Sequence, residues 1–150
     1  MYKVYRRSIF RHYLVWSFFI PIATIFTYQR IVNGPFNIYV KGMVLFYIIM
    51  FLIAATGLNY IILKSDSITF GNSFYNFWNK TFVYKEIRKI MFKNAAHGNV
   101  YLHIITHNNK SYRYVISCVD YSDLKKIASD LKENNIELEI APGIKKNYFH

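Results

Sequence analysis

Histidine is the residue type in this 150-residue chain best suited to metal binding or acid–base chemistry, and three of its five histidines lie close together. They are His97, His103 and His107. A neutral imidazole is a common zinc ligand. His103 and His107 would share one face of a strand, but residues four apart in a strand are separated by about 13 Å, too far to bind one ion. We therefore expect structural or solvent-facing roles for these histidines and no metal site.

One cysteine and a few acidic residues are the other candidates for chemistry. Cys118, the only cysteine, ends an alternating apolar run and is expected to be a small buried hydrophobic residue. Asp120 and Asp123 precede a helical pattern, where negative charge is favoured. The sequence has no phosphate-binding glycine-rich loop, metalloprotease helix motif or nucleophile elbow. An enzymatic interpretation rests only on scattered histidines and aspartates, so we expect a non-enzymatic protein without a cofactor.

Four basic residues form the most suggestive cluster, namely Lys85, Arg88, Lys89 and Lys93. A cationic side chain near an anionic lipid surface contributes about 1 kcal/mol of attraction. The cluster therefore predicts contact with lipid or with a protein partner, and an ordinary solvated face remains the alternative. The net charge of +11 would also suit nucleic acid, but no recognition motif accompanies it, and we expect no nucleic-acid partner.

The elements that must position these residues fall into two halves of different composition. Before Leu63 there are six basic residues and no Asp or Glu, whereas the remainder has thirteen basic and all eight acidic residues. An aromatic content of 19% excludes a disordered chain, and the single cysteine excludes a disulfide-stapled secreted module. The sequence therefore predicts an anchor over residues 1–63 and a second domain over residues 64–150.

Two uncharged runs in the first half, His12–Gln29 and Gly42–Leu63, are each long enough to cross a bilayer as a helix. Pro21 interrupts the first run, but such prolines are tolerated in membrane helices. Asn33-Gly34-Pro35 predicts the turn between them. A soluble pair of helices and a cleaved signal peptide are the alternatives, although neither run has the polar stripe of a surface helix.

Basic residues flank these runs unequally, and their bias predicts the orientation of the hairpin. Four precede the first run and two lie in the short loop, while the segment after Leu63 is rich in lysine. Because basic residues are retained in the cytoplasm, we expect a multi-pass protein of the inner membrane with both termini cytoplasmic.

After Lys64 the sequence alternates in short runs typical of strands. Ser67–Phe70 predicts a strand that turns at Gly71–Ser73, and Phe74–Tyr84 suits one or two more. Val100–Thr106 and Ser111–Cys118 predict a hairpin whose turn is His107-Asn-Asn-Lys110, where asparagine can adopt a left-handed conformation. A helix follows, with apolar positions Leu124, Ile127, Ala128 and Leu131 and with Asp120 or Ser122 as its cap, before a last strand at Ile136–Ile140.

This order resembles the bacterial pleckstrin-homology-like (PH-like) domains of small membrane proteins. The resemblance covers about residues 64–140 and rests on four features: the Ser67–Phe70 strand, the segment Tyr84–Ile90, the Asn-Lys turn within Val100–Cys118, and the helix start at Tyr121–Leu124. It implies one or two transmembrane helices followed by a curved antiparallel sheet with a closing helix. Bacterial origin follows from this likeness only.

We therefore expect a membrane α-hairpin joined to an α+β PH-like domain, acting as a scaffold without catalytic activity. The domain would bind a protein partner or the anionic membrane surface, and the bilayer itself would be the first partner. The alternative is a membrane-embedded immunity or secretion-accessory protein that acts through its transmembrane helices.

Overall fold

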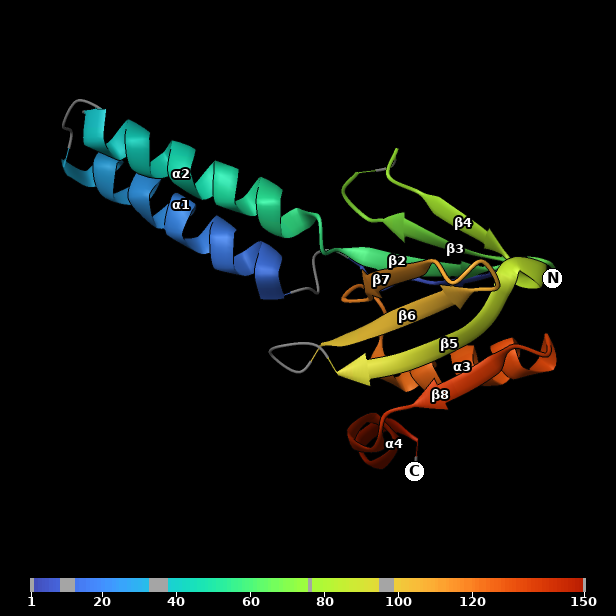
Figure 1. Cartoon of the computed structure of the whole chain (residues 1–150). Coiled ribbons are helices and arrows are strands. Elements are labelled where there is room, and N and C mark those ends of the chain that lie inside the picture. Colours follow the sequence, from blue (N-terminus) through green and yellow to red (C-terminus); the bar gives the residue numbers. More distant parts are fainter. Residues whose placement is uncertain (1, 9–12, 33–37, 76, 95–98, 150) are drawn as a thin grey trace. The chain divides into compact units, whose positions relative to one another are not determined.

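The computed structural model describes residues 2–8, 13–32, 38–75, 77–94 and 99–149 (Figure 1). The chain forms two compact units, which we call the helical unit, Ser8–Thr56, and the module, Met1–Arg7 together with Gly57–His150. The module thus takes residues from both ends of the predicted anchor, and its boundary differs from the expected one at Leu63. The predicted turn at Asn33–Pro35 and His97 lie outside the described residues.

The helical unit contains two long apolar helices, α1 (Tyr13–Val32) and α2 (Ile38–Ala55). They contact each other through aromatic rings, and the ring of Phe18 meets those of Tyr47 and Phe51 edge-on at centroid distances of 6.5 and 5.7 Å. Thr24 and Thr27 donate their hydroxyl hydrogen bonds to backbone carbonyls four residues earlier. These hydroxyl donors are therefore satisfied inside their own helix.

The predicted second span is too long, because its last five residues form strand β2 (Asn59–Leu63). Ile61 and Leu63 on this strand are buried in the module. Tyr60 and Ile62 on the other face are half-buried, so the strand has a nearly continuous apolar sequence, and such a run cannot be distinguished from the end of a membrane helix by hydropathy.

The first sheet has the antiparallel order β1-β2-β3-β4, with β1 (Lys3–Tyr5), β3 (Ser67–Asn72) and β4 (Lys80–Val83). The predicted turn at Gly71–Ser73 is wrong, since Gly71 and Asn72 continue β3. Gly71 lies opposite Tyr60, and a Cβ at position 71 would stand 2.4 Å from the tyrosine ring. Glycine at this position makes room for the ring, which explains its presence inside a strand.

The second sheet has the order β7-β6-β5-β8, with β5 (Ile87–Asn94), β6 (Val100–Thr106), β7 (Ser111–Val115) and β8 (Glu137–Ile140). The predicted hairpin is confirmed as β6 and β7, and Asn109 in its turn has a φ of 57°. A short 3-10 helix, η2 (Tyr84–Glu86), joins β4 to β5. The last strand, β8, pairs in parallel with β5, which the alternating pattern does not reveal.

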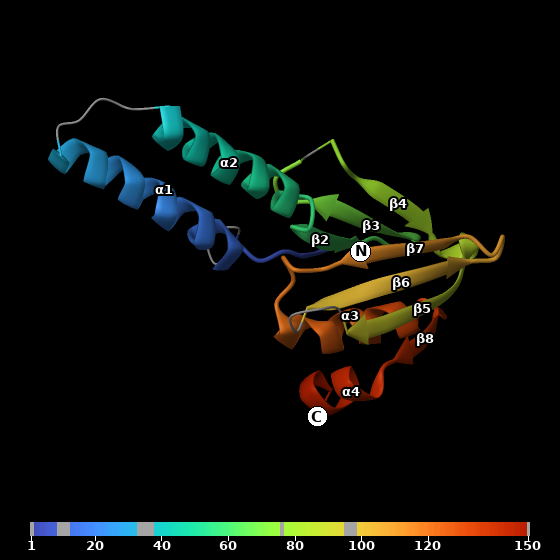
Figure 2. The same cartoon turned by 60° about the vertical axis from the view of Figure 1, so that its left-hand side comes forward.

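Helix α3 (Leu124–Glu133) closes the sheet-rich region on one face of the second sheet (Figures 1 and 2). Its predicted apolar face is confirmed, because Leu124, Ile127, Ala128 and Leu131 are all buried in the core. The predicted cap is not formed: α3 follows a 3-10 turn, η4 (Tyr121–Asp123), and neither element has a side-chain cap hydrogen bond. A short helix, α4 (Pro142–Tyr148), follows β8.

Aromatic rings connect the two sheets within one core. Phe70 of β3 stacks on Tyr114 of β7 at 4.3 Å between centroids, and Phe82 of β4 lies 4.9 Å from Tyr112. The order of the elements confirms two N-terminal apolar helices followed by a sheet-rich region with a closing helix.

The core makes a direct prediction at Phe92, a fully buried residue of β5 whose ring meets that of Phe149 at 6.2 Å. Phe92→Ala is expected to destabilise the module by about 3–5 kcal/mol, since it removes buried apolar surface and leaves a cavity. Thermal unfolding of the detergent-purified chain measures the loss. Met91→Ala, at the half-buried neighbouring position, is the control and should cost much less; equal losses would contradict the assigned register.

Candidate interaction site

The strands of the first sheet run between two ends of the module. At the tethered end, defined by Arg7, Leu58, Asn59, Ser73 and Cys118, the chain enters from α2 and leaves towards α1. The amides of Arg7 and Ser73 donate to the carbonyls of Cys118 and Leu58, each at 2.7 Å, and the Cys118 amide donates to Asn59 at 3.0 Å. Both connections to the helical unit therefore leave from the same end of the module.

The opposite end, which we call the distal end, is formed by η2 and the β6–β7 turn. Asn59 pairs with Asn72, and β3 runs from there back to Ser67, opposite Val83. The His107 amide donates to the Glu86 carbonyl at 2.9 Å, so η2 and the turn are joined. At about 3.3 Å per residue, the five steps from Asn72 to Ser67 separate the two ends by roughly 16 Å.

The four basic residues predicted as a contact cluster are spread over η2 and the length of β5. Lys85 belongs to η2 at the distal end, and Arg88 donates to Asn109 Oδ1 in the β6–β7 turn at 3.0 Å. Lys93 lies near the other end of β5, where the next residue, Asn94, pairs with Val100. The structure brings Lys85 and Arg88 towards one turn, and it does not bring Lys93 to them.

Lys89 is occupied by two acidic residues of β8. Its Nζ lies 2.7 Å from Glu139 and 3.3 Å from Glu137. Hydrogen bonds to Glu139 and Glu137 raise the pKa of Lys89, and the hydrogen bond from Lys89 lowers the pKa of Glu139. Sequence reasoning missed this pairing because the partners are brought together only by the parallel contact of β5 with β8. Lys89 is therefore compensated and contributes little net positive charge to a binding face.

A pocket of about 360 Å³ at the distal end contains two basic residues that the sequence pattern did not single out, Lys80 and Lys110. Glu86 is the only acidic residue in its lining, and the basic side chains there are Lys80, Lys85, His107 and Lys110. Lys80 Nζ lies 6.0 Å from the ring centroids of both Phe82 and Tyr112, within the range of a cation–π contact. We call this site the distal basic pocket. Its lysines come from three separate elements, so no sequence run could have revealed it.

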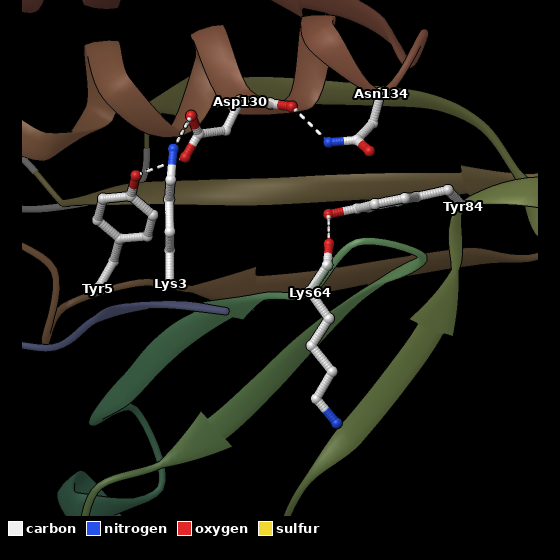
Figure 3. Close-up of polar contacts among 6 residues, drawn as sticks. All are labelled: Lys3, Tyr5, Lys64, Tyr84, Asp130 and Asn134. Atoms are coloured by element: carbon white, nitrogen blue, oxygen red, sulfur yellow. Dashed lines mark hydrogen bonds and ion pairs between the residues drawn. The ribbon is translucent and has the colours of Figure 1, made fainter. Parts of the chain in front are cut away.

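A second polar cluster joins the first strand to α3 (Figure 3). Lys3 Nζ donates to Asp130 Oδ1 and Tyr5 Oη donates to Asp130 Oδ2, both at 2.6 Å. Asn134 Nδ2 donates to the Asp130 carbonyl at 2.7 Å, and Tyr84 Oη nearby donates to the carbonyl of Lys64 at 3.1 Å. Asp130 is buried, with 9% of its surface exposed. No local sequence pattern indicates this cluster, because Lys3 and Asp130 are 127 residues apart.

The electrostatics of this cluster favour a structural role. Burial acts to raise the pKa of Asp130, but the hydrogen bonds from Lys3 and Tyr5 and the charge of Lys3 together lower it. Burial and the hydrogen bond to Asp130 raise the pKa of Tyr5 well above its ordinary value. Asp130 therefore stays ionised and Tyr5 stays protonated, and both carboxylate oxygens are already engaged. The cluster fixes the N-terminal strand to α3.

The other residues considered for chemistry lie in separate places. His103 Nε2 is 2.8 Å from Ser111 Oγ, and burial lowers the pKa of this histidine. Cys118 is buried as expected, and burial raises the pKa of its thiol. Asp120 pairs with Arg7 and Asp123 with Lys126. Within the part of the chain that the structure describes, no group of three or more His, Cys, Asp or Glu residues could hold a metal ion.

No protein-family model matches the chain, and no curated protein matches it.

The Asp130 cluster predicts a specific loss of stability. Asp130→Asn keeps the shape of the side chain but removes the ion pair, and it is expected to cost about 1–2 kcal/mol, since Lys3 is itself one-third exposed. Thermal unfolding of the purified chain measures this change. Asp123→Asn is the matched control, because its partner Lys126 is mostly exposed, and the loss should be within about 0.5 kcal/mol. Equal effects would contradict a structural role for Asp130.

The same cluster predicts how stability depends on pH. Because the pKa of Asp130 is lower in the folded state, the unfolded chain binds the proton first as the pH falls. The contribution of Asp130 is therefore complete above the ordinary aspartate pKa of about 4 and is lost as the pH falls through the folded value. Melting temperatures measured across this range should fall less steeply for Asp130→Asn than for the unaltered chain. Parallel curves would show that Asp130 makes no such contribution.

Proposed function

We propose that this chain is a non-enzymatic membrane protein in which a two-helix hairpin anchors a PH-like module that binds a protein partner. The observation that carries the proposal is the exposure of the helices. The segments Val15–Val32 and Ile38–Ala55 are long and apolar enough to cross a membrane, and only 6% of each is buried. The core helix of a soluble protein is mostly buried, whereas a lipid bilayer would cover these surfaces.

The charges of the helices support the same proposal. Of the described residues within α1 and α2, only Arg30 and Lys41 are charged, in the last turn of one helix and the first turn of the next. Both lie beside the connection between the helices, where long side chains can reach the headgroups. A hairpin with charges at its ends and none at mid-depth suits an anchor.

The sidedness follows from connectivity and charge. Since Lys3–Tyr5 and Asn59–Leu63 pair in one sheet, the chain must enter and leave the bilayer on the same face. Basic residues are far more numerous on the module side than beside Arg30 and Lys41. The positive-inside bias therefore supports a cytoplasmic location for the module and both termini, at the inner membrane of a bacterium.

The PH-like assignment is supported by the run of antiparallel strands from β2 to β7 followed by α3. Two features depart from the expected pattern. Strand β8 adds in parallel to the edge of the second sheet, and β1 comes from before the helical hairpin. These additions extend the sheets without introducing catalytic groups.

The distal basic pocket favours a protein partner over the anionic surface of the same membrane. Lys85 and Arg88 lie at the end of the module away from the two connections to the hairpin, roughly 16 Å along the strands. An acidic segment of another protein fits a pocket lined by three lysines and one histidine.

Cysteine labelling tests the anchor and its sidedness. Cys118 is buried, so it can be replaced by alanine, and single cysteines can then be introduced by Tyr39→Cys in α2 and Asn108→Cys in the module turn. An impermeant maleimide applied to intact spheroplasts should label position 39, and it should label position 108 only after permeabilisation. The reverse pattern would overturn the orientation. Recovery of the chain in the soluble fraction without detergent would overturn the anchor.

Photocrosslinking in intact membranes tests the distal basic pocket. A photoactivatable residue at position 108 should capture a protein, and the adduct should be lost in Lys85→Glu/Lys110→Glu because two pocket cations are reversed. Lys93→Glu is the matched control, with the charge change outside the pocket, and should retain the adduct. If position 108 captures only lipid, the contact is with the membrane surface and the protein-partner proposal fails.

A further inference from the structure

The described residues of the β3–β4 connection, 73–75 and 77–79, expose large aromatic side chains at the surface of the module. Phe77 is 86% exposed and Trp78 is 58% exposed, and no charged residue lies between Ser73 and Asn79. Adjacent exposed aromatic rings without charges are uncommon on a surface that faces only water, and they mark contact with a protein or a membrane. This segment, which we call the aromatic loop, has a role that the anchor and the distal basic pocket do not explain.

Hydrogen bonds fix the aromatic loop to the tethered end of the module. Asn72 Oδ1 accepts from the amides of Phe74 and Tyr75, each at 2.9 Å, and so organises the start of the loop. The Trp78 amide donates to the Tyr75 carbonyl at 2.9 Å. The loop is therefore a built turn that presents Phe77 and Trp78 outward.

The covalent chain places this loop close to the end of α2. The amide of Ser73, the first residue of the loop, donates to the carbonyl of Leu58 at 2.7 Å. Leu58 follows Ala55, the last residue of α2, by three residues, which span at most about 11 Å. If α2 crosses the bilayer, the loop begins within this distance of the point where the chain leaves the hydrocarbon.

A cation lies at the same place. Arg6 Nη2 is 3.5 Å from the Ser73 carbonyl, and its guanidinium lies 5.0 Å from the ring centroid of Tyr60. Tryptophan and other amphipathic rings concentrate at the headgroup level of membranes, and an arginine beside them can pair with lipid phosphate. Aromatic rings and a basic side chain at the tethered end match the chemistry of this layer.

We propose that Phe77 and Trp78 insert into the headgroup layer of the bilayer and make the aromatic loop a further membrane contact of the module. This proposal rests on the proposed function, since it needs the hairpin to span a bilayer. With the two chain connections, the loop gives the module a third point of attachment and limits its rotation over the membrane. The distal basic pocket would then stay directed towards the cytoplasm.

The chain has only two tryptophans, which allows a direct test with the full-length protein. Trp16→Phe leaves Trp78 as the only indole, and Trp78→Phe leaves Trp16 of α1. Each variant is reconstituted in vesicles of phosphatidylcholine and phosphatidylglycerol with brominated acyl chains. We expect the fluorescence of Trp78 to be quenched more by bromines at the shallow end of the acyl chain than by deep ones. Acrylamide should quench this fluorescence several-fold less than it quenches a tryptophan-containing peptide free in water.

A matched control places the indole at the end of β4 that lies away from the aromatic loop. Val83→Trp, in a chain with both natural tryptophans replaced by phenylalanine, puts the reporter at an exposed position of β4 nearer the distal end. It should be quenched freely by acrylamide and not by bromolipid. Bromolipid quenching equal to that of Trp78 would overturn a specific role for the aromatic loop.

The possible outcomes distinguish a failure of loop insertion from a failure of the membrane anchor. Quenching of Trp16 by bromolipid with none of Trp78 would overturn loop insertion and leave the hairpin in place. Quenching of neither would overturn the membrane anchor. Protection of Trp78 from acrylamide without bromolipid quenching would mean that protein covers the loop, which also overturns the lipid proposal.

Discussion

The buried carboxylate of Asp130 is the interaction on which the organisation of the chain depends. It binds Lys3 and Tyr5 and so holds the first strand, which precedes both apolar helices, against α3, which follows β7. A buried charge is tolerated only when it is paired and hydrogen-bonded, and both oxygens of Asp130 meet this condition. These contacts add to the pairing with β2 and to the hydrogen bond from the Arg7 amide to Cys118 in keeping this three-residue edge strand in the sheet.

The position of β1 in the first sheet determines how the helical unit is connected to the module. Because β1 pairs with β2, the helical hairpin is an insertion between two neighbouring strands of one sheet. Its two ends must then lie on the same face of any bilayer that it crosses, and the module is tethered through two connections. Arg7 and Leu58, beside these two connections, each form a backbone hydrogen bond within the module. The module therefore has one end at the connections and an opposite end away from them.

The surface chemistry differs between these two ends. The aromatic loop, with Phe77 and Trp78, begins beside the tether, where an amphipathic ring can have one side in lipid and the other in water. Lysines and a histidine gather at the distal end around a pocket that Phe82 and Tyr112 also line. Lys89 of β5, by contrast, is neutralised by two glutamates. Such a distribution suits a module that touches the bilayer with one end and binds an acidic partner with the other.

The sequence by itself determined the features that depend on local periodicity and composition. Two acid-free apolar runs, the hairpin centred on Asn109 and the apolar face of α3 were all predicted from residues within one element, because a helix or strand repeats its environment at a fixed period. The tertiary structure alone decided where an apolar run changes from helix to strand, since Ile61 is as hydrophobic in a buried strand as in a membrane. It alone decided that Lys89 is compensated and that Lys3 meets Asp130, because such pairs depend on strand order and on contacts across more than a hundred residues, and no local pattern encodes them.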